Sequence, residues 1–264
     1  MSKQPSHAAA TARRRGAEPP GRVRPHLVTD TAPAGWEKLR PRTLVDQAME
    51  AIIAGASRGL ILPGDRIVET EIAQALGISR VPVREALRLL ESQGLVVSEP
   101  YKGIRLMPVT QARLEQANEV RLALEVTAAR RARKLGRHRG DGRQLLAARL
   151  QALELTAARG DAYGCARADT EFHRALCELS GNAVLCGMWE QLSRQITIIV
   201  GLSTLGKPMT LIVAEHRALL EAFAAGRPAA LERALEEHIR AQNAAIDFES
   251  LVEERRRRRD RRRA

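Results

Sequence analysis

The feature that most constrains the fold is a helical periodicity that runs from Thr110 almost to the C-terminus and is broken by glycines. Apolar residues recur every three or four positions, and Gly136, Gly160, Gly181 and Gly226 stand at the breaks, where helices commonly stop. The pattern predicts six helices, over residues 111–135, 143–159, 161–180, 183–200, 210–225 and 229–249. We therefore expect an all-helical antiparallel bundle of about six helices. Since only 3% of residues are aromatic, its core must consist mainly of Ala, Leu, Val and Ile.

The part of the chain before Thr110 has a different organisation. A helical pattern from Leu44 to Ile53 ends in the glycines of AGASRG, and the Pro-Gly turn of ILPGDRI follows. Two more helices are predicted, over Glu69–Leu76 and Ser79–Gln93. LVVS and IRLMPV then read as two short strands of a hairpin around EPYKG. Three helices followed by a hairpin within about 70 residues are typical of a winged helix-turn-helix. The predicted fold is thus mainly α, with this domain before the bundle.

The third helical segment, ISRVPVREALRLLESQGLV, has two distinct faces. Its apolar stripe consists of Val83, Ala86, Leu87 and Leu90. Arg80, Arg84 and Arg88 lie on another face, Ser79 can cap the helix, and Pro82 fits its first turn. Such an end can place guanidinium groups against phosphates or guanine edges in the major groove. The alternative is an ordinary amphipathic helix with a solvated basic face.

The same residues carry a resemblance. PGDRI, then E-x-x-IA-x-x-LGISR-x-PVREALR-x-LE-x-x-GLV, then P-x-x-G, resembles the N-terminal domain of the GntR family of bacterial transcription regulators, from about Leu44 to Pro108. The resemblance implies a DNA-contacting surface that includes Ser79, Arg80, Val81, Arg84 and Gly103. Lys102 at the hairpin tip could contact the DNA backbone or minor groove. Thr70 stands where some relatives carry a basic DNA-contacting residue, so base preference could differ. Val68 stands where many relatives have a helix-capping Ser or Asn.

The net charge of +12 is concentrated at the ends of the chain. Residues 1–35 carry +4 and residues 253–264 carry +5, which leaves +3 for the 217 residues between them. We expect both ends to be disordered, and they could add non-specific attraction to nucleic acid. The three cysteines form no CxxC motif, which favours a reducing cytoplasm over a disulfide framework. No signal peptide or membrane segment is predicted.

A second constellation lies in the predicted bundle. Asp169 and His173 in DTEFH share one helix face, and two later helices present His216 and His238. One carboxylate and three imidazoles are a suitable ligand set for Zn²⁺, Ni²⁺ or Mn²⁺. The alternative is that these are surface histidines or hydrogen-bonded core histidines, because residues so distant in sequence need not converge.

This half also carries a resemblance, over about residues 110–245. EVRLALE at 119–125, the D-x-x-x-H motif and SGN at 180–182 are similar to the FadR-type C-terminal domain, or FCD domain, of one GntR subfamily. The resemblance implies that Asp169, His173, His216 and His238 hold a divalent ion in a pocket for a small carboxylate effector. Candidate effector contacts are Arg121, Asn182 and Arg194. The alternatives are a surface salt bridge of Arg121 with Glu125 and helix capping by Asn182.

The sequence thus predicts a cytoplasmic, homodimeric transcription regulator, more often a repressor in this family, that binds a palindromic double-stranded operator. The predicted parts are a disordered basic arm over residues 1–35, a winged helix-turn-helix over 36–108, an effector-binding and dimerisation domain over 109–250, and a disordered Arg-rich tail over 251–264. Two alternatives remain at this point. One is a metal-dependent hydrolase that uses the Asp/His₃ set, and the other is a non-specific nucleic-acid binder driven by the basic tails.

Overall fold

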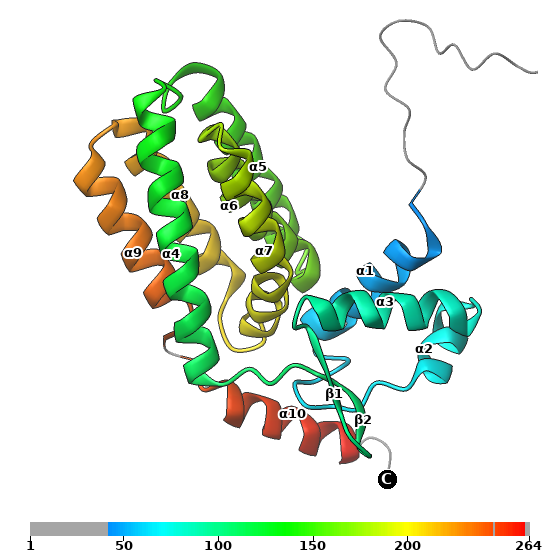
Figure 1. Ribbon diagram of the computed structural model, residues 1–264. Coiled ribbons are helices and arrows are strands. Elements are labelled where there is room, and N and C mark those ends of the chain that lie inside the picture. The colour runs from blue at the N-terminus through cyan, green and yellow to red at the C-terminus, as the bar shows by residue number, and fades with distance from the viewer. Residues whose placement is uncertain (1–41, 245, 262–264) are drawn as a thin grey trace, which may run out of the picture. The chain divides into compact units, whose positions relative to one another are not determined.

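The part of the chain described by this computed structural model, residues 42–244 and 246–261, folds into ten helices and one hairpin (Figure 1). The N-terminal elements are α1 (Leu44–Ser57), α2 (Glu69–Leu76), α3 (Arg80–Ser92), β1 (Val96–Glu99) and β2 (Gly103–Leu106). They are followed by α4 (Gln111–Lys134), α5 (Gly140–Ala158), α6 (Ala162–Leu179), α7 (Ala183–Ser203), α8 (Met209–Ala225), α9 (Pro228–Ala244) and α10 (Phe248–Arg261). The expected arm over residues 1–35 lies outside the described residues.

The N-terminal elements form the predicted winged helix-turn-helix. A capping box opens α1, in which Thr43 Oγ accepts from the backbone N–H of Asp46 and the Asp46 carboxylate accepts from that of Thr43. α3 packs on α1 and α2, and β1 pairs with β2 in antiparallel register from Val96 opposite Leu106 to Glu99 opposite Gly103. Ser79 occupies the N-cap position of α3, but its side chain makes no capping hydrogen bond, contrary to our expectation.

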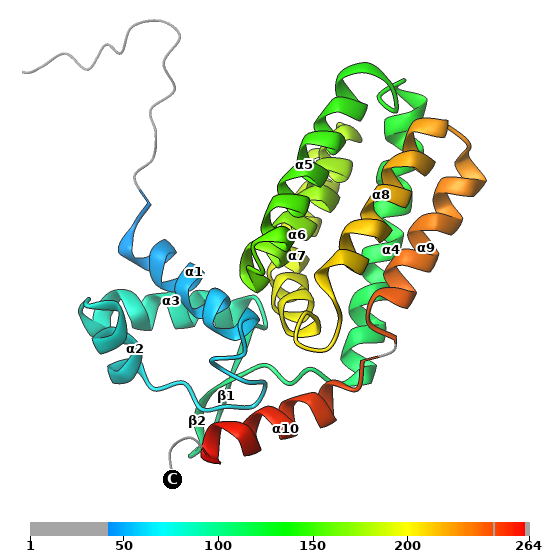
Figure 2. The same cartoon turned by 180° about the vertical axis from the view of Figure 1, so that it is seen from behind.

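The C-terminal half is the predicted helical bundle. α6 packs against α4, α5 and α7, while α8 and α9 close the bundle against α5 and α4 (Figures 1 and 2). Its core contains Leu146, Leu153, Phe172, Phe223 and Leu235, all almost fully buried. The fold is therefore mainly α, as predicted. Among the described residues, no helix is both long enough and apolar enough to span a membrane.

Helix α7 also packs against α1, which the sequence did not predict. Ile198, Ile199 and Leu202 belong to the same apolar cluster as the core of the winged helix. The backbone of α1 comes so close to α7 that a Cβ added at Gly201 would lie 2.5 Å from Cβ of Ser57. Ser57 Oγ also donates to the carbonyl of Thr197 at 3.3 Å. A glycine at position 201 is what permits this close packing.

The prediction that residues 251–264 are disordered is wrong for most of that stretch, because α10 extends to Arg261. Two apolar residues one helical turn apart, Phe248 and Val252, are 3% and 8% exposed and anchor the helix. Arginine–glutamate pairs four residues apart then extend it, as between Arg257 and Glu253 at 2.6 Å. The last predicted bundle helix, over residues 229–249, is also wrong in its C-terminal bound. α9 ends at Ala244, and residues from Phe248 onward belong to α10.

Candidate metal centre and nucleic-acid interface

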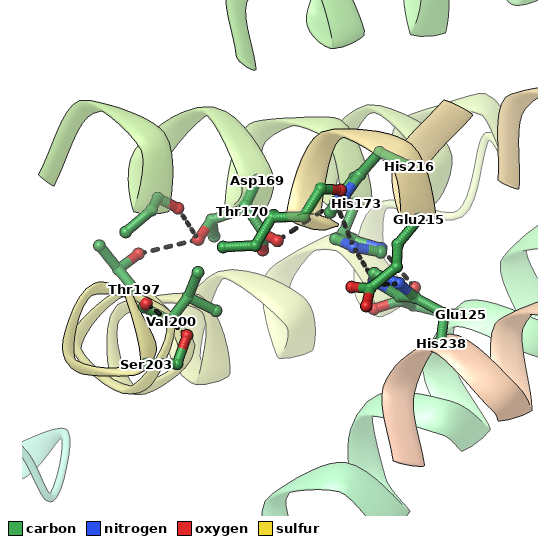
Figure 3. A network of polar contacts seen from close by, with 12 residues as sticks. Glu125, Asp169, Thr170, His173, Thr197, Val200, Ser203, Glu215, His216 and His238 are labelled. Atoms are coloured by element: carbon green, nitrogen blue, oxygen red, sulfur yellow. Dashed lines mark hydrogen bonds and ion pairs between the residues drawn. The ribbon is translucent and has the colours of Figure 1, made fainter. Parts of the chain in front are cut away.

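The four predicted metal ligands converge inside the bundle. α6 presents Asp169 and His173 one turn apart, α8 presents His216 and α9 presents His238 (Figure 3). One ligand atom from each lies within 4.8 Å of all the others, and all four side chains are buried. The packing of α6, α8 and α9 therefore achieves the convergence that sequence spacing alone left open.

The distances within this cluster are those of ligands around a common ion. His173 Nε2 lies 3.1 Å from Nε2 of His216 and 3.1 Å from Nε2 of His238. His216 Nε2 lies 3.2 Å from Oδ1 of Asp169. Ligands that each sit roughly 2.0–2.1 Å from one metal ion, with angles between octahedral and tetrahedral, are about 2.9–3.4 Å apart.

The partners of the other ring nitrogens show why a cation fits. His216 Nδ1 donates to the carbonyl of Ile212 at 2.8 Å, and His173 Nδ1 donates to the Glu125 carboxylate at 2.7 Å. Each neutral ring has its proton on Nδ1, so both Nε2 atoms carry lone pairs. Two lone pairs that face each other at 3.1 Å repel unless a cation lies between them. The donor set and its tautomers thus fit a divalent ion.

The electrostatics of the cluster favour the same protonation states. Burial lowers the pKa of His173 and lowers that of His238 well below the ordinary value, which keeps both imidazoles neutral. Burial opposes ionisation of Asp169, but the electrostatic influence of the neighbouring side chains, first of them His216, outweighs it and leaves the Asp169 pKa below its ordinary value. The Asp169 carboxylate therefore lies beside two neutral imidazoles, those of His173 and His238, which is an ionisation that suits metal ligation.

Arg121 and Glu125 pair as the sequence suggested, but in the interior and not on the surface. Arg121 Nε donates to Glu125 Oε1 at 2.8 Å, and their side chains are 1% and 0% exposed. The Arg121 guanidinium also lies 5.7 Å from the centre of the Trp189 ring. Glu125 also accepts from His173 through its second oxygen. The sequence analysis missed this role of Glu125, although the EVRLALE motif contains it.

The other two predicted effector contacts make different interactions. Asn182 caps α7, because its side-chain oxygen accepts from the backbone N–H groups of Val184 and Leu185 at 3.2 Å each. This agrees with the capping interpretation. Arg194 donates to Gln93 Oε1, at the end of α3, at 2.6 Å. The structure thus places neither side chain in the Asp169–His238 cluster, and their effector roles stay predictions.

The predicted DNA-contacting residues lie together at the exposed N-terminus of α3. Arg80 and Arg84 are 58% and 45% exposed, while the apolar stripe of the same helix is buried. Both guanidiniums pair with Glu69 of α2, at 3.4 and 3.0 Å. Glu69 was missed in the sequence analysis. Its carboxylate holds the two arginines side by side. Because these ion pairs are exposed, each stabilises the fold by at most about 1 kcal/mol.

The neighbouring candidates are also accessible. Ser79, Val81 and Thr70 are exposed beside the arginines. At the hairpin tip Lys102 is exposed and pairs with Glu99 at 2.9 Å, and Gly103 has a φ of 79°. That left-handed backbone favours glycine and forms the tight turn of the tip. The N-terminus of α3 and the hairpin tip thus present cations to solvent.

This combination defines a class of protein: a winged-helix, DNA-binding transcription regulator with a helical ligand-binding domain. Residues 44–106 match the family described as "Bacterial regulatory proteins, gntR family", and residues 116–241 match the FCD domain. A probable D-xylose utilization operon transcriptional repressor of Paenarthrobacter nicotinovorans is 31% identical over 78% of this chain and 89% of its own.

Solved structures agree with this assignment. Escherichia coli McbR/YncC superposes with a TM-score of 0.64 at 25% identity, over 79% of this chain and 98% of that one. A putative GntR regulator from Rhodococcus sp. RHA1 has the same fold, with a TM-score of 0.63 at 21% identity over 76% and 95% of the two chains. The chain belongs to the GntR family of bacterial transcription regulators and has an FCD domain. These are regulators and not enzymes, so the hydrolase alternative is wrong.

Proposed function

We propose that this chain is a homodimeric repressor whose binding to a palindromic operator is controlled by a small organic acid at a divalent metal ion in the bundle. The observation that carries the proposal is that the Nε2 atoms of His173 and His216 face each other at 3.1 Å while both Nδ1 atoms have oxygen acceptors, inside the ligand-binding domain of a DNA-binding regulator. Asp169, His173, His216 and His238 hold the ion, and Glu125 orients His173.

A carboxylate effector suits this position for two reasons. A divalent ion with one protein carboxylate keeps positive charge, and the guanidinium of Arg121, although paired with Glu125, is a group that can bind a carboxylate close to the cluster. The Paenarthrobacter relative is a probable repressor of a D-xylose utilization operon, which supports repression and the choice of sugar acids among the compounds to test.

The DNA-binding half of the proposal uses α3 and the hairpin. Arg80 and Arg84 contact base edges or phosphates in the major groove, with Ser79, Val81 and Thr70 at the same surface and Lys102 and Gly103 against the backbone. One such domain covers one half-site, so a two-fold dimer reads an inverted repeat. The effector changes the populations of dimer arrangements that fit both half-sites.

The test uses purified full-length protein. We expect elemental analysis to find about one divalent ion per chain, and His216→Ala to lose it. A panel of dicarboxylates and sugar acids should raise the melting temperature of the wild type more than that of Arg121→Ala, and the active acid should weaken binding to a duplex selected from a random library. Metal-free wild type, or no response to any acid while selective DNA binding persists, would contradict the effector mechanism.

A further inference from the structure

Helix α10 has two faces with different chemistry. Its inner face carries the buried Phe248 and Val252, followed by the partly buried Arg256 and Arg259. From position 253 onward, its exposed residues, which form the outer face, are Glu253, Glu254, Arg257, Arg258, Asp260 and Arg261. The outer face begins acidic and ends mainly basic, with three exposed arginines and one aspartate, which also suits the helix dipole.

The inner-face arginines fix the basic end of α10 to the winged helix. Arg256 Nη2 donates to the carbonyl of Pro63 at 2.5 Å, and its Nε donates to Asp65 Oδ1 at 3.3 Å. Arg259 Nη1 donates to Asp65 Oδ2 at 2.5 Å. These contacts span more than 190 positions of sequence and lie in the loop before α2. They hold the helix in place without using the outer face.

That loop runs beside β2, since Gly64 N–H donates to the carbonyl of Leu106 and Leu106 N–H donates to that of Asp65. Asp65 is followed by Arg66, whose Nε would lie 3.3 Å from a Cβ at Gly103. Both views draw the end of α10 beside the β1–β2 hairpin (Figures 1 and 2). The exposed arginines of α10 therefore continue the basic surface that begins with Lys102 and Arg66 at the tip.

The charge at this end exceeds what the helix needs for its own stability. Residues 253–261 contain six arginines and three acidic residues. Arg257 and Arg258 pair with Glu253 and Glu254 one turn earlier, and such exposed pairs contribute only roughly 0.2–0.5 kcal/mol each. A denser anionic partner can therefore replace the glutamates with little loss.

We propose that the outer face of α10, through Arg257, Arg258 and Arg261, binds the phosphate backbone of duplex DNA next to the stretch contacted by the hairpin tip. The guanidinium group suits bidentate contact with phosphate oxygens, and these contacts carry no sequence information. α10 thus adds affinity and position to the sequence selectivity of α3. The proposal rests on the DNA-binding class of the protein and not on its metal or effector.

The test compares two triple variants of the full chain with equal loss of charge. Arg257→Gln, Arg258→Gln and Arg261→Gln are combined in one, and the exposed Arg139→Gln, Arg143→Gln and Arg159→Gln of the α5 region are combined in the other. Fluorescence anisotropy with a random-sequence duplex of about 40 base pairs gives the affinity at several salt concentrations. The α10 variant should lose up to about 2.7 from the slope of log K against log salt, since each phosphate contact contributes about 0.9. Equal slopes for both variants would overturn the proposal.

A double variant tests the same proposal independently, in case the triple α10 variant does not fold. Glu253→Gln with Glu254→Gln frees the arginines from their internal partners, so duplex affinity should rise. An unchanged or lower affinity, or tighter binding of single-stranded RNA of equal length, would refute it. Selectivity is the ratio of the affinities for a library-selected duplex and for the random duplex, and it should stay unchanged in the α10 variants. If the α3 assignment is wrong, Arg84→Ala will also leave this ratio unchanged.

Discussion

At the scale of single residues, the sequence identified the four residues of the proposed metal site but not Glu125, which orients one of them. Asp169 and His173 could be paired from their four-residue spacing, whereas His216 and His238 converge with them only through tertiary packing. Glu125 was seen only as a partner of Arg121, because nothing in the sequence indicates that its second oxygen reaches a histidine 48 positions away. Local spacing predicts pairs within one helix, and it cannot predict contacts between helices.

Glu125→Gln tests the role of this carboxylate. The amide keeps the size of the side chain but weakens the interaction that fixes the His173 tautomer, so divalent metal affinity should fall by roughly 10–100-fold. Competition with a chromogenic chelator measures this. Glu115→Gln, an exposed change on the same helix, is the control and should leave the affinity unchanged. An equal affinity in both variants would remove Glu125 from the metal site.

The cysteines provide a second residue-scale prediction. Cys165 and Cys177 are fully buried, and burial raises the pKa of Cys165 to about 12. Cys186 is only half-buried. In the native protein at pH 8, a thiol reagent should therefore modify Cys186 alone, and all three thiols should react in denaturant. Rapid labelling of native Cys186→Ser would show that the interior opens.

At the scale of elements, periodicity and glycine breaks predicted the helices well, but two features depended on tertiary contacts. α10 was taken for a disordered tail because its arginines dominate the composition, while Phe248 and Val252 supply the burial that orders it. The only sequence feature related to the packing of α1 on α7 is the glycine at position 201. A glycine inside a helix does not reveal which backbone approaches it.

Two glycines of α7 make this contact testable. Gly201→Ala places a methyl group against Ser57 and should destabilise the protein by about 1–3 kcal/mol through overpacking. Gly187→Ala, on the same helix with nothing within 4 Å of the added carbon, should stabilise it by roughly 0.5–1 kcal/mol. Urea denaturation of both variants gives the two values, and a similar stability change in both would argue against the close packing.

At the scale of the whole molecule, the fold class and the family could both be predicted from the sequence. The connection between the DNA-binding and ligand-binding halves could not, since it depends on side chains that meet only after folding. Thr170 follows Asp169, a proposed metal ligand. The Thr170 hydroxyl lies 3.0 Å from that of Thr197, and the Thr197 carbonyl accepts from Ser57 of α1. Figure 3 shows Thr170 and Thr197 beside the ligands. Buried polar contacts thus link the residue next to Asp169 in the sequence to the winged helix.

Removal of the metal should therefore affect the entire unfolding transition. An ion that binds only the native state adds about 2.7 kcal/mol when present at 100 times its dissociation constant. Treatment with a chelator should lower the melting temperature in one cooperative step, and the addition of a divalent ion should restore it. His216→Ala should be indifferent to the chelator. A wild-type protein equally stable in both conditions would show that the four residues hold no ion.

The core of the winged helix draws Ile198, Ile199, Leu202 and Phe248 from parts of the chain far beyond β2. The winged helix-turn-helix therefore shares its hydrophobic core with the C-terminal half and is not an independent domain. A chimaera joined after Leu106, with a foreign sensor in place of α4 to α10, would leave apolar faces of α1 and the hairpin without their natural cover. Swaps of specificity in this regulator are better made by grafting the exposed residues of α3 into the intact chain.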